Sequence, residues 1–234
     1  MLFSKLCDIG LNNTAALIIV LVLTAAAGYF IGSLNFGIIL SRRLFSDDVR
    51  EKGSGNAGST NMVRNYGWKA GLLTLGGDMI KTAVAVLVGM LLFLERGMFI
   101  GGIFCMLGHI FPCYYGFKGG KGVACFVIIV LMTSVKMGMW YLFVILLVIF
   151  VVIVAGTKFI SLGSVICAML YPILMNRFDT YLASLKPELG FLVVYEIFAV
   201  ILAVIVVFQH RENIKRLMNG QENKISFKKK KKDE

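Results

Sequence analysis

The amino-acid sequence predicts an all-α integral membrane protein, a bundle of about seven transmembrane helices of which one or two are short. Three observations lead to this fold class. Hydrophobic residues make up 58% of the 234 residues, whereas soluble domains contain roughly 45–50%. Apolar runs with few charges recur along the chain, and runs of about 18 or more such residues span membranes. Backbone polar groups in lipid must be satisfied within their own segment, so each run is expected to be a helix.

The expected helices follow from the apolar runs in chain order. They cover residues 14–40, 70–93, 98–117, 123–133, 138–155, 159–175 and 189–208. The first run is too long for a signal peptide and is expected to remain as a span. The fourth run is short, which leaves three alternatives: a tilted helix, a helix buried among its neighbours, or a re-entrant pair with the third. Gly28, Gly32 and Gly37 are small residues near helical spacing, which allows close helix packing.

The distribution of lysine and arginine predicts the orientation in the membrane. An odd number of crossings places the termini on opposite sides, and the side richer in basic residues is the cytoplasm. With the N-terminus outside, the inner loops hold most of the 24 basic residues. The outer segments hold only Lys5, Arg96, Lys136, Arg177 and Lys186, and Lys81 lies within a helix. The sequence therefore predicts an external N-terminus and a cytoplasmic C-terminus.

Charge and cysteine content exclude several classes of function. The net charge of +11 is attributed to membrane orientation and anionic lipid, so no nucleic-acid partner is expected. The five cysteines, Cys7, Cys105, Cys113, Cys125 and Cys167, lack metal-ligand spacing and are odd in number. They predict neither a disulfide framework nor a metal site. Residues 1–227 are expected to form one membrane-embedded domain, and residues 228–234 a basic, disordered tail.

The most polar segment, residues 53–67, reads GSGNAGSTNMVRNYG. Glycines allow backbone N–H groups to approach an anion closely and to form a concave nest. Arg64 can hold a phosphate group with two parallel hydrogen bonds. The candidate binding residues of this segment are Gly53, Ser54, Gly55, Asn56, Gly58, Thr60, Asn61 and Arg64. A plain glycine-rich connector is the alternative, although a connector would not require so many donors beside an arginine.

A second segment, GFKGGKG at 116–122, precedes an apolar helix. Glycines before a helix N-terminus favour anions, and lysine adds a point charge. The candidates are Lys118, Gly119, Gly120, Lys121 and Gly122. The spacing is not that of a Walker A motif. The alternative is a simple turn between two spans, with lysines that only orient the chain.

A third segment, HRENIKRLMNGQEN at 210–223, is expected to continue the last helix beyond the membrane surface. His210 and Asn213 share one face at i, i+3 spacing, and Arg211 lies on another with Lys215. Glu222 is a further polar candidate. An interfacial basic helix that binds lipid headgroups is the alternative interpretation. All three segments are predicted to lie at the cytoplasmic face and to converge there on one pocket.

Ionisable residues also occur inside the apolar runs. Asp78 and Lys81 form an i, i+3 pair within the second run, and His109 lies near the end of the third. Such residues are energetically expensive in a membrane and usually functional. The alternatives are a structural ion pair and a histidine that serves only in packing. We expect all three to support the site rather than to bind metal.

Taken together, these segments resemble the PlsY family, the bacterial acyl-phosphate:glycerol-3-phosphate acyltransferases. The resemblance covers almost the whole chain and includes GSLNFG at 32–37, GSGNAGSTNMVR at 53–64, GGDMIK at 76–81, GHIFPCYYGFKGGKGVA at 108–124, TKFISLGS at 157–164 and HRENIKRL at 210–217. Two positions depart from the family pattern. Asn35 replaces a frequent proline, and Cys125 replaces a common threonine.

The resemblance implies transfer of a fatty acyl group from acyl phosphate to the sn-1 hydroxyl of glycerol 3-phosphate, the first step of phospholipid synthesis. Lysophosphatidic acid and phosphate are the products. It implies catalytic roles for Ser54, Arg64, Lys121, His210 and Asn213. Membrane lipids are the only other partners expected. A monomer in the bacterial plasma membrane, with no cofactor, is also expected.

Two mechanisms remain open for the proton of the acceptor hydroxyl, because the HxxxxD arrangement of another acyltransferase group is absent. Either His210 takes the proton or the departing phosphate takes it, and the phosphate is favoured. Two other functions compete with acyl transfer. A transporter for phosphorylated metabolites would show inverted repeats, which the sequence lacks. A purely structural, lipid-organising protein would leave the 53–67 segment unexplained.

Overall fold

The computed structural model describes residues 14–185 and 192–225. All regular secondary structure within these residues is helical. The chain divides into two compact units, Met1–Thr133 and Ser134–Glu234, each of which is described by itself. Four helices in the described residues are long and apolar enough to cross a membrane, or five if one bent pair counts as a span. The prediction of an all-α membrane protein is confirmed. The count of about seven spans, the orientation and the single domain over 1–227 stay predictions, and the basic tail lies outside the described residues.

The first unit begins with α2 (Thr14–Ser33) and α3 (Phe36–Phe45). The prediction of one helix over 14–40 is wrong at its end, because the helix is interrupted at Leu34 and Asn35. Asn35 is the N-cap of α3, and its Oδ1 accepts from the amide of Ile38 at 3.3 Å. Its Nδ2 donates to the carbonyl oxygen of His109 at 3.4 Å. The amide side chain thus starts a new helix and ties it to a distant part of the unit.

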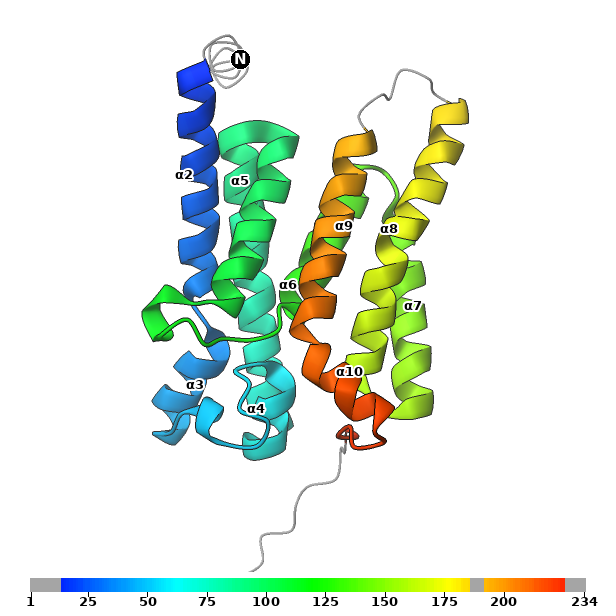
Figure 1. The fold of residues 1–234 in the computed structure, drawn as a ribbon. Helices are drawn as coiled ribbons and strands as arrows, with labels where there is room; N and C mark the ends of the chain where they lie inside the picture. Colours follow the sequence, from blue (N-terminus) through cyan, green and yellow to red (C-terminus); the bar gives the residue numbers. More distant parts are fainter. Residues whose placement is uncertain (1–13, 186–191, 226–234) are drawn as a thin grey trace, which may run out of the picture. The chain divides into compact units, whose positions relative to one another are not determined.

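Helix α5 (Trp68–Ile110) is a helical hairpin of two arms, which doubles back at Phe93 and Leu94 (Figure 1). These two residues leave the helical region, with φ, ψ of −144°, 34° and 52°, −140°. A Cβ on Gly101 would lie only 3.3 Å from the Cα of Gly89, so the two arms approach backbone to backbone. The arms correspond to the expected helices 70–93 and 98–117, but the expected end of the second at 117 is wrong. The second arm ends at Ile110 because Pro112 cannot continue a helix.

Glycines bring α2 against the second arm of α5. A Cβ on Gly28 would lie 3.0 Å from the Cα of Gly101, and one on Gly32 would lie 2.7 Å from the Cα of Cys105. The close packing expected of these two glycines is therefore confirmed. Gly37 also packs closely, but against the backbone of Ala57 in a loop rather than against a helix.

A small apolar cluster supports the loops of the first unit. Ile38, Val49, Ala57, Met62 and Ala70 are buried together, and Leu40, Tyr66 and Tyr115 pack against them. These residues come from α3, η1 (Val49–Glu51), α4 (Ser59–Tyr66), the start of α5 and η2 (Cys113–Tyr115), except Ala57, which lies in the loop between η1 and α4. The unit continues into α6 (Val123–Lys136), which has 14 residues and confirms the expected short helix. Ala57 and Met62 belong to the 53–67 segment, so their burial in the cluster holds that segment against α3, η1 and the start of α5.

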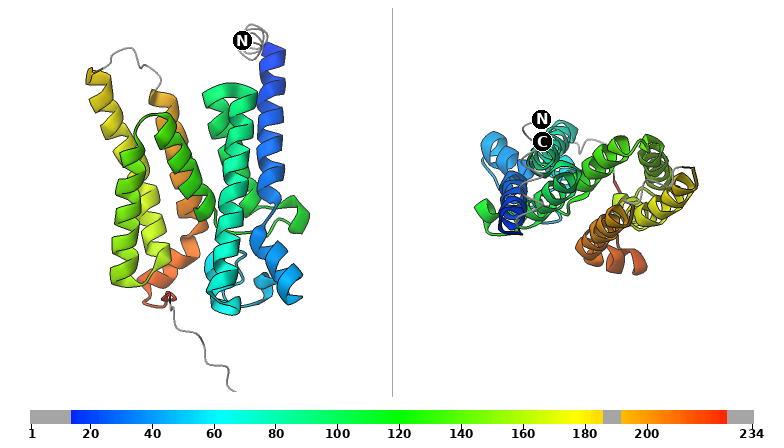
Figure 2. Two further views of the ribbon diagram at one scale, coloured as in Figure 1. Left: turned by 180° about the vertical axis from the view of Figure 1, so that it is seen from behind. Right: turned by 90° about the horizontal axis from the view of Figure 1, so that it is seen from above.

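The second unit contains α7 (Trp140–Thr157), α8 (Ile160–Leu185), α9 (Leu192–Gln209) and α10 (Arg211–Met218). Within this unit α8 contacts both α7 and α9, and the three lie side by side (Figure 2). They correspond to the three expected helices, although α8 extends to Leu185, beyond the expected end at 175. The expected continuation of the last helix through residue 210 is wrong, because α10 bends away from α9 by 58° at His210.

Candidate functional site

The 53–67 segment is organised around the side chain of Asn61, which is 2% exposed. Its Nδ2 donates to the carbonyl oxygens of Val49, Lys52 and Asn56 at 2.9–3.0 Å. Its Oδ1 accepts from the amide of Ser54 at 3.0 Å. Asn61 was expected to contact a phosphate, but its hydrogen bonds hold the loop. Its geometry favours a positioning role.

Other polar groups in the same segment face outward. Arg64 lies on α4 and is exposed, and it makes no hydrogen bond or ion pair to the described residues. The side-chain hydroxyls of Ser54 and Thr60 also have no hydrogen-bond partner in the described chain. Asn56 instead accepts from the amide of Gly58 at 2.9 Å and closes a turn. Ser54, Thr60 and Arg64 are therefore among the side chains of this segment that remain for a ligand, together with the half-buried hydroxyl of Ser59.

The 116–122 segment runs between η2 and α6. The amide of Gly119 donates to the carbonyl oxygen of Ile110 at 3.0 Å, and that of Gly120 donates to the carbonyl oxygen of His109 at 3.1 Å. These two residues therefore do not provide the expected nest of free amides. Gly120 is buried and Gly122 has φ of 80°, a conformation that favours glycine. Lys118, Lys121 and the first amides of α6 are the cations and donors of this segment, and their binding of an anion stays a prediction.

The two glycine-rich segments contact each other in the first unit, as predicted. The amide of Ala57 donates to the carbonyl oxygen of Gly119 at 3.5 Å. Arg50 in η1, just before the first segment, also holds the start of the second, through hydrogen bonds to the carbonyl oxygens of Tyr115 and Lys118. Arg50 is not distinguished in the sequence, because an arginine in a polar loop resembles any other positive-inside residue. The third segment belongs to the second unit, and its convergence with the other two stays a prediction.

A buried polar network lies beneath the second segment. The Nζ atom of Lys81 lies 2.8 Å from Oδ1 of Asp78, which confirms the expected i, i+3 pair. The same Nζ lies 3.0 Å from Nδ1 of His109 and donates to the carbonyl oxygen of Leu34 at 2.7 Å. All three ionisable side chains are at most 3% exposed. The ring of His109 packs directly against Gly120, so the network supports the second segment from within the unit.

In the third segment, Glu222 gathers three donors. Its Oε1 accepts from Nδ2 of Asn213 at 2.6 Å and from Oγ of Ser161 at 2.8 Å. Its Oε2 accepts from Nε of Arg216 at 2.9 Å. Burial alone would raise the pKa of the Glu222 carboxyl, but these three donors outweigh it and hold the pKa below its ordinary value. Glu222 thereby fixes the orientation of the Asn213 side chain.

His210 and Arg211 differ in exposure. His210 is 3% exposed, and its Nδ1 lies 2.8 Å from the carbonyl oxygen of Val206. A ring nitrogen beside a carbonyl oxygen carries the hydrogen, so in the neutral ring Nε2 is the acceptor. Arg211 is exposed, and its guanidinium lies 4.7 Å from the centre of the Phe208 ring. The two residues, adjacent in sequence, thus face different surroundings.

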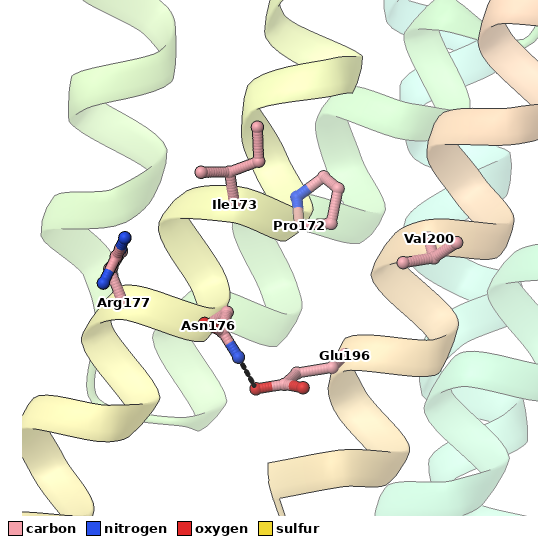
Figure 3. Close-up of a pocket in the computed structure, with 6 residues that line it drawn as sticks. All are labelled: Pro172, Ile173, Asn176, Arg177, Glu196 and Val200. Atoms are coloured by element: carbon pink, nitrogen blue, oxygen red, sulfur yellow. Dashed lines mark hydrogen bonds between the residues drawn. The ribbon is translucent and has the colours of Figure 1, made fainter.

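A separate cleft lies between α8 and α9 in the second unit (Figure 3). Its volume is about 530 Å³, and its lining consists of Pro172, Ile173, Asn176, Arg177, Glu196 and Val200. Nδ2 of Asn176 donates to Oε1 of Glu196 at 2.8 Å. Val200 and His210 are about 15 Å apart along the chain at the rise of a helix. The cleft contains none of the predicted site residues.

Fold and site together define an integral membrane protein of apolar helices with a glycine-rich, cationic loop surface. A family model described as glycerol-3-phosphate acyltransferase matches residues 22–220. The chain belongs to this family of membrane acyltransferases.

Individual relatives agree with this assignment over most of their length. The glycerol-3-phosphate acyltransferase of Carboxydothermus hydrogenoformans is 36% identical over 209 residues, which cover 89% of this chain and 98% of that protein. The Bacillus subtilis protein of the same name is 34% identical over 204 residues, which cover 85% and 94%.

A solved structure shares the fold. The crystal structure of PlsY (YgiH), an integral membrane glycerol 3-phosphate acyltransferase in its glycerol 3-phosphate form, superposes with a TM-score of 0.75 at 27% identity. The match covers 88% of this chain and 96% of that one. A lysophosphatidic acid form gives a TM-score of 0.72. The expected resemblance to the PlsY family is confirmed, which favours an acyltransferase over a transporter or a lipid-organising protein.

Proposed function

We propose that this protein transfers a fatty acyl group from acyl phosphate to the sn-1 hydroxyl of glycerol 3-phosphate. One observation of the site supports this most directly. The 53–67 and 116–122 segments lie in contact, and Arg64 on the first has no partner among the described residues. Both substrates carry a phosphate group, so a site for them needs cations on neighbouring loops. Arg64 and Lys121 are the proposed grips, with Lys118 and Arg211 as further cations.

The reaction requires little activation of the nucleophile. The acceptor oxygen attacks the carbonyl carbon, the bond from that carbon to the phosphate oxygen breaks, and one proton leaves the hydroxyl. The products are lysophosphatidic acid and inorganic phosphate. Because phosphate is a good leaving group, catalysis consists mainly of positioning two anionic heads and stabilising charge on the carbonyl oxygen. In this proposal Ser54 and Thr60 supply hydrogen-bond donors.

The proton is assigned to the departing phosphate, with His210 and Asn213 orienting the substrates. A phosphate oxygen is itself basic and sits beside the attacking oxygen. Since Nδ1 of His210 lies against a carbonyl oxygen, Nε2 can accept a hydrogen bond from a substrate hydroxyl. Glu222 holds Asn213 through its amide nitrogen. His210 as the base remains the competing version.

The proposal places the site at the cytoplasmic face, where glycerol 3-phosphate arrives from water while the acyl chain remains in the bilayer. No cofactor is needed, and a monomer suffices. The side of the membrane can be tested with Thr60→Cys in an active variant that lacks other reactive cysteines. A membrane-impermeant thiol reagent is then applied to intact cells. Labelling from outside intact cells would contradict it.

The decisive experiment supplies purified protein in vesicles with palmitoyl phosphate and glycerol 3-phosphate. We expect equal amounts of lysophosphatidic acid and phosphate, with the acyl group at the sn-1 position by mass spectrometry. Palmitoyl-coenzyme A and palmitoyl-acyl carrier protein serve as competing donors. Product formed from either of these at the rate seen with palmitoyl phosphate would overturn the assignment of the donor.

A further inference from the structure

Arg50 forms a clasp between η1, which directly precedes the first segment, and the turn that leads into the second segment. Its Nη1 donates to the carbonyl oxygens of Tyr115 at 2.6 Å and of Lys118 at 3.0 Å. On its other edge, Nε lies 3.0 Å from Oδ1 of Asp48, and Nη2 lies 2.8 Å from Oδ2. All three guanidinium nitrogens are thus bound within the protein. Arg50 is therefore not arranged to contact a substrate.

The loop that Arg50 holds is sharply folded. Gly116 and Phe117 have φ of 67° and 59°, and Phe117 donates its amide to the carbonyl oxygen of Pro112 at 3.0 Å. Positive φ is uncommon for a residue other than glycine and persists where surrounding contacts hold it. The two hydrogen bonds from Arg50 flank this turn, at Tyr115 and Lys118. They are such contacts.

Asp48 keeps the guanidinium in place. Hydrogen bonds from Arg50 hold the pKa of the Asp48 carboxyl well below its ordinary value, against the opposing effect of burial. Asp48 also accepts from the backbone amide of Arg50 at 3.0 Å, so side chain and main chain are fixed together. The pair therefore stays charged throughout the neutral range, and the clasp is independent of pH there.

We propose that Arg50 is a positioning residue that sets the Lys118–Lys121 turn against the Arg64 loop. The proposal rests on the proposed function, because the turn is taken to bind a substrate phosphate. A guanidinium can grip a carboxylate and two carbonyl oxygens at once, since its donors form a rigid planar fork. A lysine at this position can hold Asp48 or the turn, but not both. Loss of the fork frees the turn while leaving the local positive charge.

Arg42 provides a matched control. It also pairs with Asp48, at 2.9 Å, and its guanidinium lies 5.6 Å from the centre of the Tyr115 ring. It makes no hydrogen bond to the Tyr115 or Lys118 carbonyl oxygens, and its side chain is 51% exposed against 19% for Arg50. Arg42→Gln removes the same charge from the same carboxylate and leaves the clasp intact.

The experiment compares Arg50→Lys, Arg50→Gln and Arg42→Gln in the full-length protein. Steady-state kinetics give kcat and KM for both substrates. Protection against thermal unfolding by inorganic phosphate and by glycerol 3-phosphate reports binding without turnover. Both Arg50 variants should lose about 10- to 100-fold in kcat/KM, mostly through KM, because a small displacement of a binding group costs up to about 100-fold. Their phosphate protection should shift to at least about 10-fold higher concentration, while Arg42→Gln stays within about twofold of the parent.

Three results would overturn the proposal. Arg50→Lys could match the parent, Arg42→Gln could lose as much as Arg50→Gln, or both Arg50 variants could fail to fold, which would make Arg50 a folding residue. Protection against thermal unfolding by phosphate tests the role of Arg50 separately from the proposed acyl transfer, because it does not require turnover. Without any acyl transfer by the parent protein the proposed function fails, whereas the clasp is still judged by the binding of phosphate.

Discussion

Replacing Gly120 with alanine should disturb the site through His109. A Cβ at this position would lie 2.8 Å from Cε1 and 2.9 Å from Cδ2 of the His109 ring, and closer still to Nε2. Comfortable contacts between such atoms lie at about 3.5–4.0 Å, so the ring would have to withdraw by roughly 1 Å. The ring cannot move freely, because its Nδ1 lies 3.0 Å from Nζ of Lys81 and 3.4 Å from Oδ1 of Asp78.

The expected cost follows from this geometry. Overpacking a buried site destabilises by about 1–3 kcal/mol, and a chain of this size loses roughly 2–4 °C of melting temperature per kcal/mol. Gly120→Ala should therefore melt several degrees below the parent protein. Its kcat/KM should fall by more than the loss of folded protein explains, because the second segment is displaced. Gly76→Ala is the control, since a Cβ there would meet no atom within 4 Å; it should be as stable as the parent or slightly more so.

A double-mutant cycle with His109→Ala separates this collision from other effects. Melting temperature in detergent and lysophosphatidic acid formation are measured for the two single variants and for the pair. Removing the ring opens space for the new methyl group, so the double variant should be no worse than His109→Ala alone. Strictly additive losses would refute the reasoning and show that Gly120 is needed for its backbone conformation instead.

Three further predictions concern named side chains. Arg64→Ala and Arg64→Lys should both lower kcat/KM at least about 10-fold without a change in melting temperature, because an ammonium cannot reproduce the planar fork; Lys121→Ala should behave likewise, and near-normal turnover in these variants would disprove the two phosphate grips. His210→Gln should retain substantial activity while His210→Ala loses it, since glutamine forms hydrogen bonds but takes no proton at neutral pH; equal loss in two folded variants with unchanged substrate binding would identify His210 as the base. Glu222→Gln should destabilise by about 1–3 kcal/mol. Because the folded pKa of Glu222 is depressed, its stabilisation is present above the unfolded pKa of about 4.3 and is lost as pH falls through the folded value; melting curves of parent and variant should converge at acid pH, and parallel curves would disprove this assignment.

Helix prediction succeeded where hydrophobicity alone was decisive. A lipid environment requires each span to satisfy its own backbone, so an apolar run such as 138–155 admits one structure, and α7 is found there. The same signal failed at Asn35 and at His210, which lie at breaks between consecutive helices. One polar side chain ends a helix through its particular hydrogen bonds, and a hydrophobicity pattern contains no information about those partners.

The sequence also indicated which residue types of the candidate site could bind an anion. Arg64, Ser54 and the lysines at 118 and 121 stand out because glycine-rich, donor-rich loops are unusual beside apolar helices. Direct ligand contact could not be separated from support in the same way. Asn61 has the side chain of a ligand-binding residue, yet four hydrogen bonds commit it to its own loop.

The sequence by itself therefore determined the class of protein, the positions of most helices and the residue types proposed to bind a phosphate, because composition and local spacing are enough for these. Only the tertiary structure decided which polar groups remain for a ligand and which are consumed internally. Arg50, 65 residues from Tyr115 in the chain, touches its carbonyl oxygen, and Asp78, Lys81 and His109 meet under Gly120. Such contacts join residues far apart in sequence, and hydrogen bonds between them depend on distances that no local pattern contains.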